Sequence, residues 1–292
     1  MALPHAIPEA IAKATGMPFT PAKQRAVSGG CINQSYLLAD AERSFFVKLN
    51  DAKRLRMFEA EAAGLKEILA SHTVRAPRPL CHGTAGDQAF LVMEYLELRA
   101  HGDAAVLGQQ LAMMHRPSQA YFGGPRDNTL GSTPQPNTQT AEWITFLRER
   151  RIGYQLRLAA QNGYGGKLQT QGEKLLAKLD QFFRDYHPQA SLLHGDLWGG
   201  NHAYLPDGTP VIFDPAVYYG DRETDLAMTE LFGSFAPAFY AAYQEAWPLD
   251  AGYAERKTLY NLYHILNHAN LFGGGYAAQA LQMIAQLNAE LA

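Results

Sequence analysis

The residues best suited to chemistry lie close together in the second half of the chain. His194-Gly195-Asp196 follows an apolar segment, and Asn201 stands five positions after Asp196. A second apolar segment, Val211-Ile212-Phe213, then ends at Asp214. Phosphoryl transfer needs a carboxylate that orients the attacking hydroxyl and accepts its proton, together with oxygen ligands for Mg²⁺. The spacing therefore predicts Asp196 as the base, and Asn201 and Asp214 as the metal ligands.

Each of these elements also has a simpler interpretation. A His-Gly-Asp run is often only a polar turn, and an aspartate such as Asp214 can be a helix cap. One element alone would favour the simpler interpretation. The ordered set, with the spacing found in kinases, favours phosphoryl transfer.

The first third of the chain supplies a candidate phosphate anchor. Lys48 ends a strand-like segment, and such a lysine reaches nucleotide phosphates when a carboxylate on the following helix fixes it. Glu59 and Glu61 are the candidates on that helix. Glu61 shares a helix face with Phe58 and Leu65, so we predict the pair Lys48–Glu61. The alternative is that Lys48 is an ordinary surface lysine.

A glycine-containing run, Ser28-Gly29-Gly30-Cys31-Ile32-Asn33, joins two predicted strands upstream of Lys48. Paired glycines let the backbone approach an anion closely, and exposed N–H groups bind phosphate. A plain hairpin turn is the alternative. The chain contains no Gly-x-x-x-x-Gly-Lys-Ser/Thr motif, which excludes the P-loop kinases.

The elements that must position these residues fall into two groups. Residues 1–97 read as an opening helix, Ile7–Thr15, and short strands with one main helix, Arg54–Ser71. Residues 98–292 are dominated by helical patterns around one β-rich segment, Leu192–Phe213. The strands are predicted at Gln24–Ser28, Asn33–Ala39, Ser44–Leu49, Leu80–Gly83 and Gln88–Glu94. The later helices are predicted at Asp103–His115, Ala141–Ala160, Gln171–Tyr186, Glu223–Phe232 and Glu255–Phe272. Segregated strands and helices indicate an α+β protein with a small antiparallel-sheet lobe and a larger helical lobe.

Composition excludes several classes of protein. The net charge of −3 argues against nucleic-acid binding, which needs a basic face. No apolar run approaches the roughly 20 residues of a membrane span. Two cysteines are too few for a disulfide framework and suit a reduced compartment. We expect a soluble cytoplasmic protein, a monomer or homodimer, that binds neither nucleic acid nor membranes.

Longer stretches resemble the fructosamine kinase (ketosamine-3-kinase) family, within the aminoglycoside-phosphotransferase-like branch of the protein-kinase-like, bilobal fold. The resemblance covers nearly the whole chain. Its motifs are Gly29-Gly30-Cys31-Ile32-Asn33, Phe46-Val47-Lys48, Met57-Phe58-Glu59-Ala60-Glu61, Gly131-Ser132-Thr133-Pro134-Gln135-Pro136-Asn137, Leu193-His194-Gly195-Asp196-Leu197-Trp198, the run from Asp214 to Glu223, and the run from Leu262 to Tyr276.

The resemblance implies transfer of the ATP γ-phosphate to the 3-hydroxyl of a ketosamine, the product of a sugar on an amine. In the family the phosphorylated adduct decomposes and frees the amine, which is a deglycation repair. Asp196 would be the base, Asn201 and Asp214 the Mg²⁺ ligands, and Lys48 with Glu61 the phosphate anchor. A hinge at Met93-Glu94-Tyr95-Leu96 would present backbone groups to adenine.

Substrate contacts are expected from aromatic residues near the base. Trp198 could stack on the sugar or on the methylenes of the amine, while Tyr218, Tyr219 and His264 could approach from the helical lobe. Packing in the core is the alternative for the last three. Asp225 is expected to brace the catalytic loop by hydrogen bonds. Cys31 lies in the predicted phosphate loop, where its oxidation would block nucleotide binding; an inert loop side chain is the alternative.

Two other functions remain open. A kinase of the same branch could act on choline, homoserine or an aminoglycoside, and a pseudokinase could serve as a binding module. The sequence does not choose between fructosamines, ribulosamines and erythrulosamines, or between a free ketosamine and a glycated protein.

Overall fold

The computed structural model describes residues 4–27 and 32–291. It divides into two compact units. The first contains Met1–Asp103 and His202–Pro215, and the second contains Ala104–Asn201 and Ala216–Ala292. Strands are concentrated in the first unit and helices in the second, so the predicted α+β class is confirmed.

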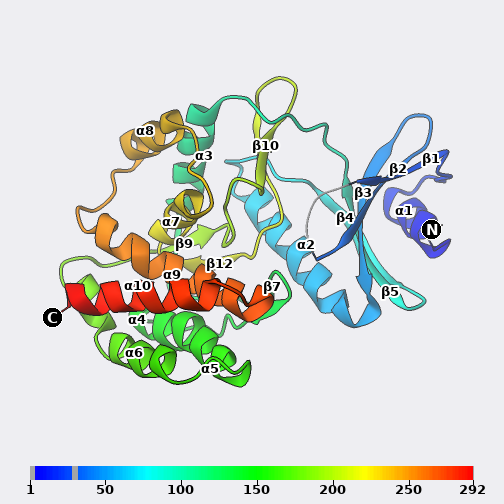
Figure 1. The fold of residues 1–292 in the computed structure, drawn as a ribbon. Coiled ribbons are helices and arrows are strands. Elements are labelled where there is room, and N and C mark those ends of the chain that lie inside the picture. Colours follow the sequence, from blue (N-terminus) through cyan, green and yellow to red (C-terminus); the bar gives the residue numbers. More distant parts are fainter. Residues whose placement is uncertain (1–3, 28–31, 292) are drawn as a thin grey trace. The chain divides into compact units, whose positions relative to one another are not determined.

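The first unit is built on a five-stranded antiparallel sheet in the order β1-β2-β3-β5-β4 (Figure 1). Its strands are β1 (Lys23–Val27), β2 (Gln34–Ala39), β3 (Ser44–Asp51), β4 (Pro79–Ala85) and β5 (Gln88–Glu94). The predicted strands all lie within two residues of these bounds. Their apolar residues, bounded by turn residues, explain why the sequence pattern located them.

The alternation of side chains along β3 divides the sheet into two faces. Phe45, Val47 and Leu49 point to one face, where they form a core with Ile7 and Ile11 of α1 (Ala6–Thr15). Lys48 therefore points to the other face. Figure 1 shows α1 and α2 (Leu55–Ala70) on opposite sides of the sheet. A short 3₁₀ turn, Ala52–Arg54, leads from β3 into α2.

A hairpin from the second half of the sequence belongs to the first unit. Strands β10 (His202–Tyr204) and β11 (Pro210–Ile212) pair with each other. Backbone hydrogen bonds then tie them to the earlier segment, Ile212 N to Arg75 O at 3.0 Å and Arg99 N to Tyr204 O at 2.7 Å. The boundary predicted after residue 97 placed this hairpin in the second lobe, because pairing across more than 100 residues leaves no local sequence signal.

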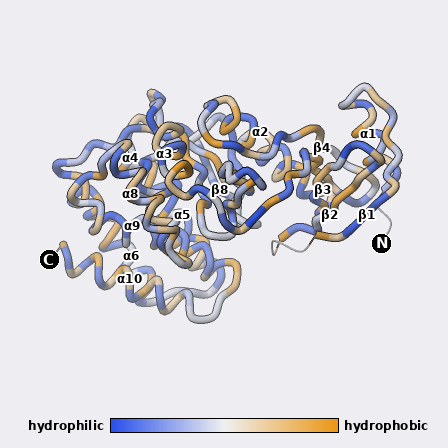
Figure 2. Tube along the Cα trace, turned by 90° about the horizontal axis from the view of Figure 1, so that it is seen from above, coloured by the Kyte–Doolittle hydropathy of each residue, from blue (hydrophilic) through white to orange (hydrophobic). Residues whose placement is uncertain are grey.

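The second unit is mainly helical. Its α-helices are α3 (Ala104–His115), α4 (Trp143–Phe146), α5 (Gly153–Gln161), α6 (Lys167–Leu176), α7 (Glu223–Leu231), α8 (Pro237–Ala246), α9 (Tyr253–Phe272) and α10 (Tyr276–Glu290). A π-helical turn, Leu147–Ile152, joins α4 to α5, and a 3₁₀ helix spans Leu179–Phe183. The amphipathic character of α10 is visible in Figure 2, where hydrophilic and hydrophobic residues alternate along it.

Two helix predictions need correction. The helix predicted at Gln171–Tyr186 begins earlier, at Lys167, and ends at Leu176 before the separate 3₁₀ helix. The segments that form α8 and α10 were not predicted as helices. Both are rich in alanine, and some of their buried positions are occupied by alanine or asparagine, which do not stand out as an apolar face in the sequence.

Small sheets in the second unit shape the loops around Asp196. Strands β6 (Ser118–Gln119), β9 (Ala190–Leu193) and β12 (Tyr218–Gly220) form one sheet in the order β12-β9-β6, and β7 (Asn128–Leu130) pairs with β8 (Thr133–Gln135). The predicted β-rich segment, Leu192–Phe213, contains β10 and β11 and overlaps the end of β9, but β6, β7, β8 and β12 lie outside it. No helix in the described ranges is both long and apolar enough to span a membrane.

Candidate active site

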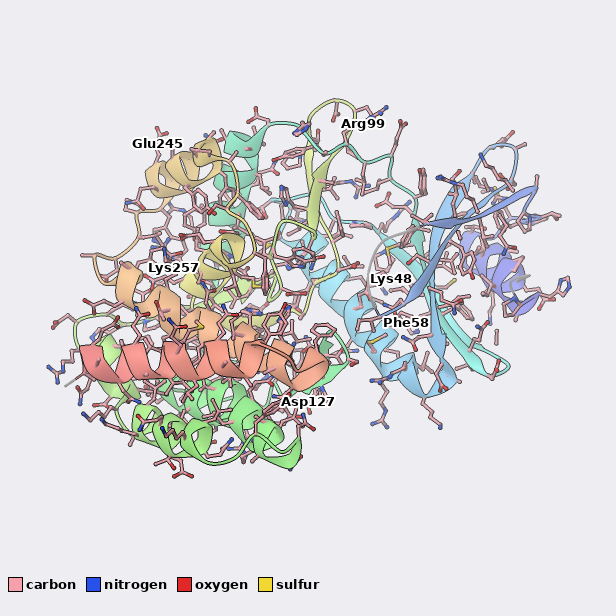
Figure 3. The ribbon with its side chains drawn as sticks, viewed as in Figure 1. Lys48, Phe58, Arg99, Asp127, Glu245 and Lys257 are labelled. Atoms are coloured by element: carbon pink, nitrogen blue, oxygen red, sulfur yellow. The ribbon has the colours of Figure 1, made fainter. Side chains whose placement is uncertain are left out.

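In the first unit, Lys48 forms the predicted ion pair with Glu61. Its ammonium group donates to Glu61 Oε1 at 2.6 Å, and it also donates to Asp214 Oδ1. Figure 3 labels Lys48 on the sheet and Phe58 on α2; Phe58 lies one turn before Glu61. Glu61 points to the sheet because it shares the buried face of α2 with Phe58 and Leu65.

The charges in this cluster are strongly coupled. Burial alone would lower the pKa of Lys48, but the carboxylates of Asp214 and Glu61 outweigh burial and raise it above its ordinary value. Burial, with Asp214 nearby, raises the pKa of Glu61 in spite of Lys48. Lys48 is therefore a permanently charged group with little solvent around it, 5% of its side chain being exposed. Its ammonium group is oriented by the two carboxylates that accept from it.

Asp214 has an unusual backbone. Its φ angle is 56°, in the left-handed region that residues other than glycine seldom occupy. Its carboxylate accepts from Lys48 through Oδ1, while 42% of the side chain is exposed. Backbone strain of this kind persists where the surroundings impose it, often at functional sites. Asp214 is thus held by Lys48 through Oδ1, while part of its side chain stays exposed.

In the second unit, Asn201 holds Asp196. Its Nδ2 donates to the backbone oxygen of Asp196 at 2.9 Å and to Oδ2 at 3.2 Å. The backbone N–H of Asn201 donates to Trp198 O at 2.9 Å, which closes the turn between the two residues. Because the amide nitrogen of Asn201 donates to Asp196, its amide oxygen is the side-chain atom that could accept a cation.

Asp225 on α7 braces the loop that carries Asp196, as predicted. Its carboxylate accepts the backbone N–H groups of His194 at 2.7 Å and Gly195 at 2.9 Å. His115 Nε2 lies 3.2 Å from the same carboxylate. Burial would raise the pKa of Asp225, but the hydrogen bonds and charge of His115 and His194 outweigh burial and lower it. Asp225 is therefore an ionised, buried acceptor that fixes the loop backbone.

Gly195 is required by the close packing of this loop. Its φ angle is 80°, and a Cβ atom at this position would lie 2.2 Å from the backbone oxygen of Ala216. The two segments are joined by a hydrogen bond from Ala216 N to His194 O at 2.8 Å. A side chain at position 195 would push the loop away from the segment that follows Pro215.

The predicted phosphate loop is only partly described. Gly29, Gly30 and Cys31 lie outside the described residues. Asn33 is described, and its Oδ1 accepts from Asn50 Nδ2 at 2.7 Å. A cavity of about 350 Å³ in the first unit is lined by Ile32, Asn33, Gln34, Leu49, Asn50, Asp51, Asp87 and Gln88.

The predicted hinge follows the last residues of β5. Met93 is buried in the sheet, while Glu94 ties the hinge to the preceding segment by accepting from Arg75 Nη2 at 2.7 Å and from Arg78 N. Tyr95 and Leu96 lie just beyond the strand, with Tyr95 N donating to Ser44 O at 3.4 Å. Both oxygens of the Glu94 carboxylate are thus engaged by Arg75 and Arg78.

The predicted substrate residues differ in exposure. Trp198 is 39% exposed, which suits a contact with substrate. Tyr218, Tyr219 and His264 are buried in the second unit, which favours the alternative that these three side chains pack in the core. Tyr218 packs under the Arg151 guanidinium, 3.9 Å from the ring centroid, and Tyr219 contacts Tyr121 edge-on. Burial lowers the pKa of His264 to about 3, so its ring is a neutral part of the core.

Comparison with known proteins decides the family. The family profile described as fructosamine kinase matches residues 3–290. The chain belongs to the fructosamine kinase family. A probable ketoamine kinase of Synechocystis is 51% identical over 96% of this chain and 95% of its own length. A chloroplastic protein-ribulosamine 3-kinase of Arabidopsis thaliana is 43% identical over 88% of this chain and 80% of its own length.

Solved structures support the same fructosamine kinase fold. A putative fructosamine-3-kinase from Haemophilus somnus superposes with a TM-score of 0.88, at 29% identity over 96% of each chain. An ADP-bound aminoglycoside phosphotransferase, APH(2'')-Ib, has a TM-score of 0.65 at 13% identity, covering 98% of this chain and 99% of its own. At that identity the likeness concerns the fold alone. The predicted protein-kinase-like fold is confirmed.

Some positioning residues of this fructosamine kinase were missed from the sequence. Gln135 Nε2 donates to Ala216 O at 3.1 Å, and Asn128 Nδ2 donates to Val217 O at 2.8 Å, so β7 and β8 hold the segment after Pro215. Arg151, on the π-helical turn, donates to Asn137 Oδ1 at 2.6 Å. His115 was also missed. A single glutamine, asparagine or histidine in a mixed segment carries no spacing signal, although the Gln135 and Asn137 motif was visible as part of the family resemblance.

Proposed function

We propose that this protein is an ATP-dependent kinase that phosphorylates the 3-hydroxyl group of ketosamines. The observation that carries the proposal is the fructosamine kinase match over residues 3–290, on a chain whose Asp196 is held by Asn201 and whose catalytic loop is braced by Asp225. The names of the relatives, ketoamine kinase and protein-ribulosamine 3-kinase, supply the acceptor class.

Asp196 acts as the general base in this proposal. Its carboxylate accepts the proton of the substrate 3-hydroxyl while that oxygen attacks the γ-phosphorus of ATP. The bond between the γ-phosphorus and its bridging oxygen breaks, and ADP leaves with the electron pair. The hydrogen bond from Asn201 Nδ2 to Asp196 Oδ2 at 3.2 Å restricts the rotation of the carboxylate, which favours one approach of the hydroxyl.

Lys48 binds the ATP phosphates in this proposal. Glu61 fixes the ammonium group of Lys48, and the burial of Lys48 leaves little water to screen its charge. The backbone groups at Tyr95 and Leu96 are assigned to adenine. Gly29, Gly30 and Asn33 are assigned to the phosphates from the sequence pattern, with Asn33 anchored through Asn50.

The residues present fit Mg²⁺, which accompanies ATP in phosphoryl transfer. The donor set is the amide oxygen of Asn201 and the exposed carboxylate of Asp214, both oxygen ligands of the kind that Mg²⁺ prefers. Asn201 directly precedes β10, and Asp214 follows β11 after one residue. When bound, Mg²⁺ neutralises phosphate charge. Lys48 holds Asp214 by its other oxygen and thereby orients it.

The consequence for the substrate follows from the family. A phosphate at the 3-position makes the ketosamine unstable, so the adduct decomposes and releases the amine. We assign the protein to the repair of glycated amines, either free ketosamines or glycated lysines on proteins.

A direct test combines acceptor choice with a matched pair of variants. The purified protein, ATP and MgCl₂ are incubated with ribulosyl-lysine, fructosyl-lysine, choline, homoserine and an aminoglycoside, and ADP release is measured. We expect turnover with a ketosamine, and a fall in kcat of about 10²- to 10⁴-fold for Asp196→Asn. The control Asp180→Asn changes an exposed aspartate of the second unit and keeps full activity. Turnover with choline or homoserine alone, or full activity of Asp196→Asn, would contradict the proposal.

A further inference from the structure

A continuous strip of aromatic side chains runs across the second unit, starting beside Asp196. The strip consists of Trp198, Phe232, His268, Phe272 and Tyr276. Trp198 contacts Phe232 edge-on, with 6.3 Å between ring centroids, and Phe232 contacts His268 at 4.7 Å. His268 then contacts Phe272 at 5.5 Å and Tyr276 at 5.1 Å. These rings come from the catalytic loop, the end of α7, α9 and the start of α10.

Three side chains of the strip are exposed, although aromatic side chains are usually buried. Phe232 is 36% exposed, Trp198 39% and Phe272 54%. Scattered single exposed hydrophobic residues need no explanation, but contiguous ones mark a binding surface. The described lysines and arginines that lie over aromatic rings occupy other rings, such as those of Tyr218 and Trp247. The faces of the strip are therefore not occupied by cations from the described part of the chain.

The strip is fixed rigidly to the proposed base. Trp198 N donates to Asp196 O at 3.2 Å, and Asn201 N donates to Trp198 O at 2.9 Å. A substrate whose hydroxyl reaches Asp196 must extend over neighbouring groups, and Trp198 is the nearest exposed side chain in the sequence. In a ketosamine, only the C2 and C1 carbons separate the reacting C3 from the amine nitrogen, so the amine lies close to the start of the strip.

His268 adds a hydrogen-bond acceptor to the strip. Its Nδ1 lies 2.8 Å from the backbone oxygen of His264, which can only accept, so Nδ1 carries a proton. Burial lowers the pKa of His268, and the ring is therefore neutral at neutral pH. In that tautomer Nε2 has a free lone pair, which can accept an N–H from a ligand.

We propose that this aromatic strip binds the amine-bearing arm of the ketosamine, with its secondary ammonium group against the Trp198 ring and its alkyl chain along Phe232 and Phe272, toward His268. The inference rests on the proposed function. Aromatic faces attract ammonium groups through their quadrupole, and the same faces pack against methylenes. The strip thus selects adducts of long alkylamines such as the lysine side chain over adducts of short amines.

The test compares two ketosamines that share one sugar, the ribulosyl adducts of Nα-acetyl-lysine and of methylamine. We expect Phe272→Ala to raise KM for the acetyl-lysine adduct about tenfold, and the KM ratio between the two adducts by a similar factor, with little change in KM for ATP. Phe272 is mostly exposed, so the variant retains its fold, which circular dichroism and Tm verify. The control Met113→Ala removes another exposed side chain, on α3, and leaves both KM values unchanged.

A second arm tests the ammonium group. An ether analogue of the acetyl-lysine adduct, with oxygen in place of nitrogen, is compared with the amine as a competitive ligand. We expect about tenfold weaker binding of the ether to the wild-type protein. Equal affinity for ether and amine overturns the cationic part of the inference, and an equal KM change for both adducts in Phe272→Ala overturns the strip as an amine subsite. Absence of turnover of either adduct by the wild type instead contradicts the proposed function itself.

Discussion

The ammonium group of Lys48 donates to the carboxylate of Asp214, 166 residues later in the sequence, as well as to that of Glu61. Lys48 comes from the centre of the sheet, and Asp214 follows the hairpin that joins the first unit from the second half of the chain. Lys48 thus orients two carboxylates that differ in burial. Glu61 is buried and holds Lys48, whereas Asp214 is partly exposed and remains able to bind a ligand.

Replacing Lys48 should separate stability from activity. Lys48→Met leaves the Glu61 carboxylate buried without its cation, and we expect a loss of about 3–5 kcal/mol in the free energy of unfolding at neutral pH. The double variant Lys48→Met/Glu61→Gln should recover part of that stability but no kinase activity, because the phosphate anchor is still missing. Urea denaturation and ATP binding measure the two effects. Equal stability of the single and double variants would show that Lys48 and Glu61 are not coupled. Glu59→Gln, on the same helix, is the matched control.

Gly195 and Gly208 form a matched pair for testing the catalytic loop. Both have left-handed backbones, with φ angles of 80° and 86°, but only Gly195 has a backbone oxygen 2.2 Å from the position of an added Cβ. Gly208→Ala should cost about 1 kcal/mol of stability for its backbone alone and keep kcat. Gly195→Ala should cost more and lower kcat at least tenfold, because the loop must move away from Ala216. Similar kcat values for the two variants would argue against a role for this contact.

Glu223 should make stability depend on pH. Burial, with Asp221 nearby, raises its pKa from 4.5 to about 7, although Arg256 donates to its carboxylate at 2.7 and 3.0 Å. The folded protein therefore binds the proton more tightly than the unfolded chain. The stability that this tighter proton binding contributes is fully present below about pH 4.5. It is lost as the pH rises through about 7.

Urea denaturation of Glu223→Gln against the wild type over this pH range measures the effect of Glu223. We expect the wild type to lose stability relative to the variant as pH rises, by an amount on the order of 3 kcal/mol. Glu255→Gln, an exposed neighbour on α9, should follow the wild-type profile. Parallel pH profiles of the wild type and Glu223→Gln would exclude Glu223 as the titrating group.

The two cysteines should respond differently to oxidation. Cys81, in β4, is partly buried, and burial raises its pKa to about 11, so almost no thiolate is present at neutral pH. We propose that Cys31, which lies outside the described residues, is the reactive thiol of the phosphate loop. Under hydrogen peroxide, wild type and Cys81→Ala should lose kinase activity at the same rate, and Cys31→Ala should be protected. If Cys31→Ala loses kinase activity as fast as the wild type, oxidation of Cys31 does not control the activity.

Much of the first unit could be predicted from the sequence because its signals are local. Strand alternation placed Lys48 on one face of β3, and helix periodicity chose Glu61 over Glu59. The turn between Asp196 and Asn201 is also local, spanning few residues. Its proposed chemistry follows from residue types and spacing alone.

The burial of individual side chains could not be predicted in the same way. Tyr218, Tyr219 and His264 belong to matched motifs, yet whether an aromatic residue faces solvent depends on which distant helices cover it. For the same reason, the contact between His115 and Asp225, which are 110 residues apart, could not be predicted from the sequence. The exposed aromatic strip could not be predicted either, because its members come from separate elements.

The sequence by itself therefore determined the chemistry that we propose for this protein, namely a base, oxygen ligands, a cation and its partner carboxylate. The tertiary structure alone decided which of the remaining polar and aromatic side chains hold that chemistry in place and which face a ligand. The physical reason is that residue type and periodicity act over a few positions of the chain. Burial and long-range hydrogen bonds, such as that of Asp225 with Gly195, exist only after distant segments have packed together.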